Sequence, residues 1–274
     1  HRTPASNGNR KKFTISTWVK RAEPKGQGWI LTVDSYPSGN MLQYQLDTAA
    51  NFGIQQYHGS SVQASLTTNN LLRDSGAWYH LVLKVDTTQS TASDRMKLYI
   101  NGTEANYATT TYPSQEFEFQ VNHTTKHSIN SREDTSSGSS VYFSHYHLCD
   151  GYAYEPTEFG ETDSTTGEWK IKTDVSVSYG TNGFFIFKDG MNLSGSTVQD
   201  QSGQGNNLTL VGSSVETQDT PSNNFCTLNA LQRSRMTTDS SSDYIKQGNT
   251  TFDTTSDNAL KSINNGTIGV QSGK

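Results

Sequence analysis

The chain has 274 residues, of which 31% are apolar and 17% charged, and its formal net charge is -5. An acidic chain without a basic cluster lacks the positive field that phosphate binding needs, so we expect no nucleic-acid partner. No apolar run approaches the roughly 20 residues of a membrane-spanning helix, so we expect no membrane insertion. Ser, Thr, Asn and Gly replace the common helix formers, and this composition predicts strands and turns.

The first strand is predicted in the segment KKFTISTWVKR, residues 11–21. Phe13, Ile15 and Val19 alternate there with polar positions, while Trp18 faces the other side. The pattern therefore predicts a strand with apolar contacts on both faces. Further short runs of β-branched and aromatic residues predict strands that begin at Trp29, Met41 and Asn51.

A hairpin is predicted in residues 77–102. The run AWYHLVLKVD alternates apolar and mostly polar residues, as expected for a half-buried antiparallel strand. The next run, RMKLYI, ends at Asn101-Gly102, a dipeptide typical of two-residue hairpin turns. Later strands are predicted from Val141, Gly183 and Asn207. Regularly spaced short strands favour a two-sheet sandwich over a βαβ fold.

The chain is predicted to divide after residue 211. Residues 1–211 carry the strand pattern, whereas residues 212–274 are rich in Ser, Thr, Asn and Asp and have too few apolar residues for a core of their own. We therefore expect a β-sandwich followed by an extended polar arm or linker. The two cysteines, Cys149 and Cys226, are too few to decide whether they pair.

Several segments resemble the laminin-G-like (concanavalin-A-like lectin/glucanase) domains found in virion proteins of marine podovirus-type phages. They cover residues 3–21, 77–104, 148–170, 178–190 and 200–210, and the piece FGETDSTTGEWK is the most specific of them. The resemblance implies an all-β, antiparallel two-sheet jelly-roll sandwich. The final GTIGVQSGK resembles the lead into a SPRY-like domain, so the resemblance also implies a further β domain beyond the arm.

Laminin-G-like domains often bind calcium or glycans, and both chemistries have candidate residues. Calcium needs several oxygen ligands, and the segment DQSGQGNN offers Asp200 and Asn206. Its glycines, Gly203 and Gly205, mark a tight turn equally well, and we favour the turn. We expect no cofactor, with calcium as the one possible exception.

Sugar rings stack on aromatic side chains while neighbouring polar groups fix their hydroxyls. Candidates for such stacking lie between the first strand and the hairpin. The alternative for each aromatic residue is ordinary packing in the core. The candidate ligand-binding residues are Trp29, Tyr36, Tyr44, Tyr57 and His58.

Two patterns raise other chemistries. His145, His147 and Cys149 alternate along one predicted strand and are zinc-ligand types, although face packing is the favoured interpretation. Glu116 and Glu118 in EFEF offer paired carboxylates, but the Glu-x-Asp-x-x-Glu motif of related glucanases is absent and we interpret them as a solvated strand face. We therefore expect no enzyme.

The sequence favours a virion structural protein of a tail or head appendage that displays a lectin-like domain toward host-surface glycan. The expected location is the virion, the expected partners are other virion proteins and host polysaccharide, and a homo-oligomer is expected because appendages are symmetric. Three alternatives stay open. They are an architectural capsid or tail module without sugar binding, a glycan depolymerase, and a secreted eukaryotic adhesion domain, which sequons such as Asn101-Gly-Thr103 would suit.

Overall fold

The structure is a computed structural model of the whole chain. It describes residues 1–22, 27–34, 39–132, 140–188, 190–212, 214 and 216–224, together with the backbone of four strands within residues 228–266. Tyr36, Asp189 and Cys226 lie outside the described residues. In the described part of the chain, no helix is long and apolar enough to cross a membrane.

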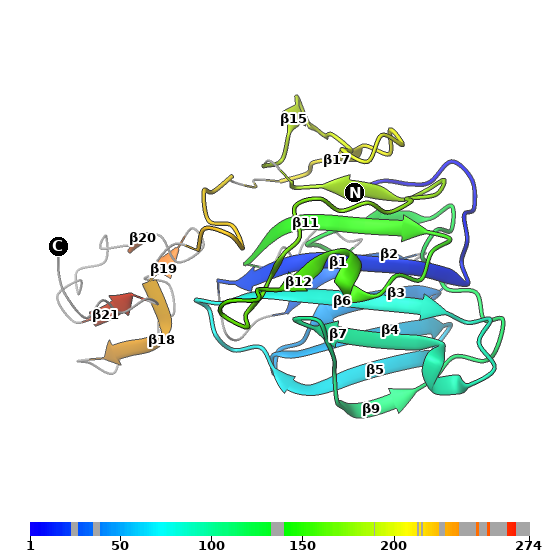
Figure 1. Cartoon of the computed structure of the whole chain (residues 1–274), viewed down its shortest axis with the longest axis horizontal. Coiled ribbons are helices and arrows are strands. Elements are labelled where there is room, and N and C mark those ends of the chain that lie inside the picture. The colour runs from blue at the N-terminus through cyan, green and yellow to red at the C-terminus, as the bar shows by residue number, and fades with distance from the viewer. Residues whose placement is uncertain are drawn as a thin grey trace.

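Two antiparallel sheets of six strands each form the sandwich, one lying in front of the other in Figure 1. The first, here called the β1 sheet, has the order β14 (Phe184–Ile186), β11 (Val141–Asp150), β1 (Lys12–Arg21), β6 (Trp78–Asp86), β7 (Met96–Ile100) and β8 (Thr103–Glu104). The second, the β3 sheet, has the order β10 (Lys126–Ser128), β2 (Gly28–Asp34), β3 (Met41–Leu46), β4 (Asn51–His58), β5 (Ser61–Leu71) and β9 (Tyr107–Thr111).

The core lies between the two sheets and takes alternate residues from each strand. Phe13, Ile15 and Val19 of β1 are fully buried and face Leu42 and Tyr44 of β3 within one apolar cluster. This alternation is what an antiparallel sheet with one packed face requires. The expected all-β, antiparallel jelly-roll sandwich is confirmed.

The predicted strands are found in the structure, but a further strand occurs where the sequence predicted none. Each predicted run contains a strand, but β5 was not predicted, although it spans eleven residues. Its sequence, SVQASLTTNNL, is mostly polar and gives no clear alternation. The prediction of a strand face at Glu116 and Glu118 was wrong, because both residues lie in a loop and Glu116 has a φ of 62°.

The predicted hairpin turn between β7 and β8 is confirmed. Asn101 and Gly102 have φ values of 49° and 79°, the left-handed conformation that a two-residue turn of this type needs. Asn101 Oδ1 also accepts a hydrogen bond of 2.8 Å from the backbone N–H of His80. A Cβ on Gly102 would lie 2.5 Å from Trp169, so the turn needs glycine for space as well as for conformation.

The outer face of the β1 sheet is covered by a second layer of chain. His80 lies between the rings of Trp18 and Trp169, at centroid distances of 4.9 and 5.9 Å. The Trp169 indole N–H donates to His80 Nδ1 at 3.0 Å, and Nε2 lies 2.8 Å from Ser16 Oγ. Because an indole nitrogen only donates, Nδ1 must accept and Nε2 carries the proton toward Ser16. This tautomer does not take a proton from Ser16, so the pair is structural.

The same layer holds His147 among aromatic rings. Its ring stacks on Phe185 at 4.0 Å, and Nδ1 lies 2.9 Å from the Tyr179 hydroxyl. Simple alternation along β11 fails nearby, since the pairing with β1 shifts between Ser16 and Trp18 and His145 has a φ of 46°. Cys149 is buried. Among the described residues, no group of three or more His, Cys, Asp or Glu side chains is placed to hold a metal.

A buried ion pair ties residues 216–224 to the sandwich. Lys20 Nζ donates to Asp219 Oδ2 at 2.7 Å and to Asn224 Oδ1 at 2.8 Å. The indole N–H of Trp78 donates to the other oxygen of Asp219 at 2.9 Å. The Lys20 and Asp219 side chains are only 0% and 4% exposed, so each charge depends on the other.

The remaining elements lie outside the two main sheets. A two-stranded sheet, β12 (Gly160–Thr162) with β13 (Trp169–Ile171), lies in the covering layer, and a three-stranded sheet joins β15 (Leu193–Ser194), β16 (Thr197–Val198) and β17 (Leu208–Thr209). Two 3-10 helices span Ala92–Asp94 and Pro156–Glu158. Beyond residue 224, β18 (Leu228–Arg235) pairs with β21 (Ser262–Gly266), and β19 (Ile245–Lys246) pairs with β20 (Thr251–Phe252). The division after residue 211 stays a prediction.

Removing one partner of the buried ion pair tests how residues 216–224 are held. We expect Asp219→Ala to lower the free energy of unfolding by about 3 kcal/mol, because it strands the Lys20 ammonium in the interior. Limited proteolysis should then cut near residue 219 at an early time point. Glu161→Ala, which breaks an exposed ion pair with Lys170, should leave the melting temperature unchanged. Equal effects from both substitutions would contradict this account.

Three buried histidines predict sensitivity to acid. Burial lowers the pKa of His80 to about 3 and of His127 to about 4, and it lowers the pKa of His147 well below its usual value. The unfolded chain binds these protons near pH 6.5, so stability is complete above that pH and is lost as the pH falls toward the folded-state pKa values. Each histidine contributes about 1.4 kcal/mol per pH unit in this window, or about 6 kcal/mol for all three at pH 5.

Urea unfolding at pH 8, 6.5 and 5 measures this loss. The variant His147→Phe keeps the ring stack and should reduce the pH slope by about a third. A free energy of unfolding that stays constant between pH 7 and pH 5 would show that these histidines become protonated without unfolding.

Candidate functional site

A cavity of about 580 Å³ opens where the residues just before β1, the residue before β3, the end of β4 and the segment before β10 meet. We call it the rim pocket. It is lined by Arg10, Asn40, Gln56, Tyr57, His58, Phe117, Glu118, Gln120 and His123. Four separate segments of the chain therefore supply one concave surface, the usual form of a small-ligand site.

The end of β4 sets the floor of the rim pocket. The pairing of β4 with β5 shifts between Gln56 and Tyr57, so these neighbours both reach the pocket. The buried Gln56 accepts a hydrogen bond of 3.0 Å from the backbone N–H of Gln120 and donates to Tyr57 O at 2.8 Å. Tyr57 in turn donates its hydroxyl proton to Gln55 Oε1 at 3.0 Å. These bonds fix the tyrosine ring before any ligand arrives.

A charged pair forms one wall. Arg10 donates from Nε to Phe119 O at 2.7 Å and from Nη1 to Glu118 Oε2 at 2.8 Å. Two of the five guanidinium N–H groups are thus engaged, which orients the plane and leaves further donors for a ligand oxygen. The Glu118 side chain is 52% exposed, so the pair is open to solvent. The wall combines hydrogen-bond donors and acceptors with little net charge.

His123 adds a polar atom that lacks a partner. Within the described part of the chain, its Nδ1 is buried and makes no hydrogen bond. Burial, followed by the nearby charge of Arg10, lowers the pKa of His123, so its ring is neutral at pH 7. A buried polar atom without a partner costs free energy that a hydroxyl of a ligand or water would recover.

The structure separates the aromatic residues that the sequence proposed as sugar contacts. Tyr57 and His58 line the rim pocket. Trp29 and Tyr44 are only 3% and 0% exposed, and they pack as interior residues, Tyr44 against Phe52 at 5.2 Å. Tyr36 lies outside the described residues. Two of the proposed residues therefore reach one site and two fill the interior.

The proposed calcium loop is occupied by its own hydrogen bonds. Asp200 accepts from the backbone N–H groups of Phe185, Ser202 and Asn206, each at 2.9 Å, and from the Ser202 hydroxyl at 2.8 Å. Asn206 Oδ1 accepts from Arg2 at 2.6 Å, and its amide group donates to the carbonyls of Thr181 and Gly183. These polar atoms tie loops together, as the turn interpretation expects.

Glu116 and Glu118, the two carboxylates weighed for hydrolysis, lie in ion pairs. Glu116 contacts Lys11 at 3.0 Å and Glu118 contacts Arg10 at 2.8 Å. Arg10, Gln120 and His123 were not among the site residues predicted from the sequence. Only the fold brings these residues to the pocket that Tyr57 lines, and no short sequence motif predicts this arrangement.

Residues 2–122 match the family model described as the concanavalin A-like lectin/glucanases superfamily. No curated protein sequence matches the chain. A proposed carbohydrate-binding protein from Bacteroides ovatus is similar at 11% identity, covering 77% of this chain and 57% of that one with a TM-score of 0.48. A heptameric SAP-like pentraxin from Limulus polyphemus shares 14% identity over 56% of this chain and 70% of its own, with a TM-score of 0.38.

The sialidase module CBM40 of Ruminococcus gnavus, solved with α2,3 sialyllactose, shares 14% identity over 50% of this chain and 80% of its own, with a TM-score of 0.34. At these identities and TM-scores, the likenesses assign neither a function nor a ligand to the present chain. Residues 2–122 are thus similar to the concanavalin A-like lectin/glucanases superfamily, and the two antiparallel sheets form the jelly-roll sandwich expected for such a domain.

Proposed function

We propose that the protein is a carbohydrate-binding module that holds a sugar in the rim pocket without cleaving it. Tyr57 and Phe117 offer ring surface, and the amides of Asn40 and Gln120 surround it with polar groups. Sugars combine apolar C–H faces with hydroxyl groups, so they suit a wall of this mixed kind. The match to a lectin/glucanase family over residues 2–122 supports the same chemistry.

The observation that carries the proposal is that one pocket is lined both by His123, whose Nδ1 has no partner, and by the oriented Tyr57 ring. A sugar stacked on the ring would bring hydroxyls to the polar lining, and a rotation of the His123 ring would let one of them bond this nitrogen. The Arg10 donors would then meet a second oxygen of the sugar. Since Glu118 neutralises Arg10, we expect a neutral or weakly acidic sugar rather than a polyanion.

We further propose that this module belongs to a phage virion appendage, where it meets host-surface polysaccharide. The support is the resemblance of its segments to virion proteins, and the expected neighbours are other virion proteins and further copies of this chain. An architectural module that packs in the particle without binding sugar is the competing function. It predicts that the rim pocket stays empty of sugar at any concentration.

Binding of the purified chain to host-surface polysaccharide tests the first proposal. We expect Tyr57→Ala to weaken binding about tenfold, because it removes the stacking ring. Tyr57→Phe keeps the ring and should retain most of the affinity. Leu71→Ala, an exposed apolar residue outside the pocket, is the matched control. Binding that is identical in all four proteins would exclude the rim pocket, and no binding at all would favour the architectural module.

The same titration in the presence of EGTA examines the calcium alternative. The carboxylate of Asp200 already accepts four hydrogen bonds, so we expect affinity and melting temperature to be unchanged by the chelator. A fall in either quantity that added calcium reverses would restore the metal assignment of Asp200 and Asn206.

Labelling of intact particles tests the proposed location. Antibodies raised against residues 1–211 should decorate an appendage of purified virions in electron micrographs. Mass spectrometry of the same particles should contain peptides of this chain. Particles that lack both signals would remove the virion assignment while leaving sugar binding untouched.

A further inference from the structure

A second concave surface lies between three loops on the other side of β11 from the core. Its volume is about 610 Å³. The loops follow β11, precede β14 and follow Asp200. We call this surface the loop groove, and its lining residues are Tyr152, Val177, Ser178, Tyr179, Gly180, Thr181, Ser202 and Gln204. It shares none of these residues with the rim pocket.

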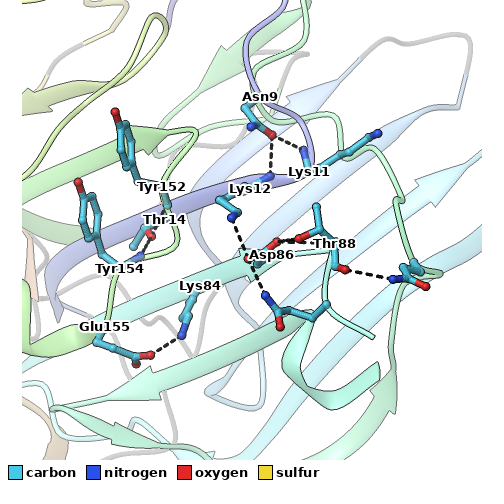
Figure 2. Close-up of polar contacts among 12 residues, drawn as sticks. Asn9, Lys11, Lys12, Thr14, Lys84, Asp86, Thr88, Tyr152, Tyr154 and Glu155 are labelled. Atoms are coloured by element: carbon cyan, nitrogen blue, oxygen red, sulfur yellow. Dashed lines mark hydrogen bonds and ion pairs between the residues drawn. The ribbon is translucent and has the colours of Figure 1, made fainter. Parts of the chain in front are cut away.

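An exposed aromatic ring stands at the edge of the loop groove. Tyr152 is 41% exposed and lies parallel to Tyr154, with ring centroids 5.5 Å apart and an interplanar angle of 7°. Figure 2 shows the two rings pointing the same way, clear of the ion pair between Lys84 and Glu155. An exposed tyrosine backed by a second ring presents one flat face to solvent.

The backbone beneath these rings is fixed by Thr14 of β1. Its hydroxyl donates to Tyr152 O at 2.9 Å and accepts from the N–H of Tyr154 at 2.7 Å, as Figure 2 shows. The Tyr154 hydroxyl accepts from the N–H of Ser178 at 2.9 Å. The first loop is therefore tied both to the sheet and to the second loop.

The other two loops are held by equally direct contacts. Tyr179 O accepts from the N–H of Asp150 at 2.9 Å. Gly180 has a φ of 68°, and a Cβ there would lie 2.1 Å from Asp150 O, so the loop lies close against β11. The Ser202 hydroxyl donates to Asp200, and Asn206 Nδ2 donates to Thr181 O at 2.9 Å. All three walls are preorganised, which lowers the cost of binding.

The lining selects the chemical class of ligand. Of the described residues that form the loop groove, none carries a formal charge. Hydroxyl groups of Ser178 and Thr181 and the amide of Gln204 supply hydrogen-bond donors and acceptors beside the tyrosine rings. An ionic ligand would lose its hydration without gaining a counter-charge. A neutral sugar, with its C–H face on Tyr152, satisfies both parts of this surface.

We propose that the loop groove is a second sugar subsite, specific for neutral saccharides, with Tyr152 as its stacking platform. This inference rests on the proposed carbohydrate-binding function but concerns a separate surface. Two subsites on one rigid sandwich let a single polysaccharide chain, or two branches of it, engage the protein twice. The gain in apparent affinity would come from effective concentration and not from new contacts.

The probes are neutral hexasaccharides of glucose, mannose and galactose, titrated by NMR against the wild-type chain, Tyr152→Ala and Tyr152→Phe. We expect Tyr152→Ala to weaken binding of at least one hexasaccharide about tenfold, while Tyr152→Phe stays within about twofold of wild type. Leu71→Ala again serves as the control, and circular dichroism verifies that each variant is folded.

Repeating the titration in a Tyr57→Ala background separates this inference from the proposed function. Binding that survives Tyr57→Ala and is then lost on adding Tyr152→Ala supports the loop groove. Hexasaccharide binding that ignores Tyr152→Ala, or polysaccharide binding that depends on Tyr57 while no neutral hexasaccharide binds, overturns the loop groove and leaves the rim pocket standing. If no saccharide of either kind binds the wild-type chain, both assignments fail.

Discussion

The central strand β1 is buried on both of its faces, and the rest of the structure follows from that constraint. A sheet with one packed face can leave the other in water, but here the outward residues Trp18 and Lys20 are buried too. An additional layer is therefore required above the β1 sheet. Trp169 and Asp219, which come from distant parts of the chain, supply it.

This covering layer determines the polar interior. A buried cation and buried imidazoles are costly unless every proton has a defined partner. Lys20 meets a carboxylate and an amide, and His80 meets an indole donor and a serine hydroxyl. The covering layer thus contributes hydrogen bonds that favour one arrangement of its side chains, whereas the sandwich core contributes the burial of apolar surface. The rim pocket lies outside this layer, whereas the loop groove shares Tyr179 with it, and both sites are loop clusters that the rigid layers hold in place.

Much of the sandwich is predictable from local patterns. β1 and the paired strands β6 and β7 alternate strongly, and Asn101-Gly102 is a specific turn dipeptide. These strands and the turn between β7 and β8 appear as expected. β5 was missed because its polar residues hide the alternation, which only the neighbouring strands make clear. The sequence of β3 could have predicted that Tyr44 is an interior residue, since Tyr44 lies on the same face of the strand as Leu42 and Leu46. The alternation of β4, by contrast, leaves Tyr57 on the outer face.

The candidate sites were predictable only in part. Tyr57 was chosen for its ring and its position near a turn, but its partners Arg10 and His123 are separated from it by about fifty residues or more in each direction, and no spacing rule connects them. The loop groove was not predicted, because residues such as Ser178 and Thr181 are common in loops and give no sequence signal of a site. The shape of the groove depends on hydrogen bonds that Thr14 and Asp200 make to its loops.

Cys149 gives the covering layer a built-in chemical reporter. Its thiol is buried beneath that layer, and burial raises its pKa far above the usual range for cysteine. Only the thiolate reacts with alkylating reagents, so in the folded state the sulfur is shielded both by packing and by protonation. Its rate of modification therefore measures how often the layer lifts from β11, an opening that need not involve the sandwich core. The rate at which the covering layer opens can thus be measured separately from the unfolding of the whole molecule.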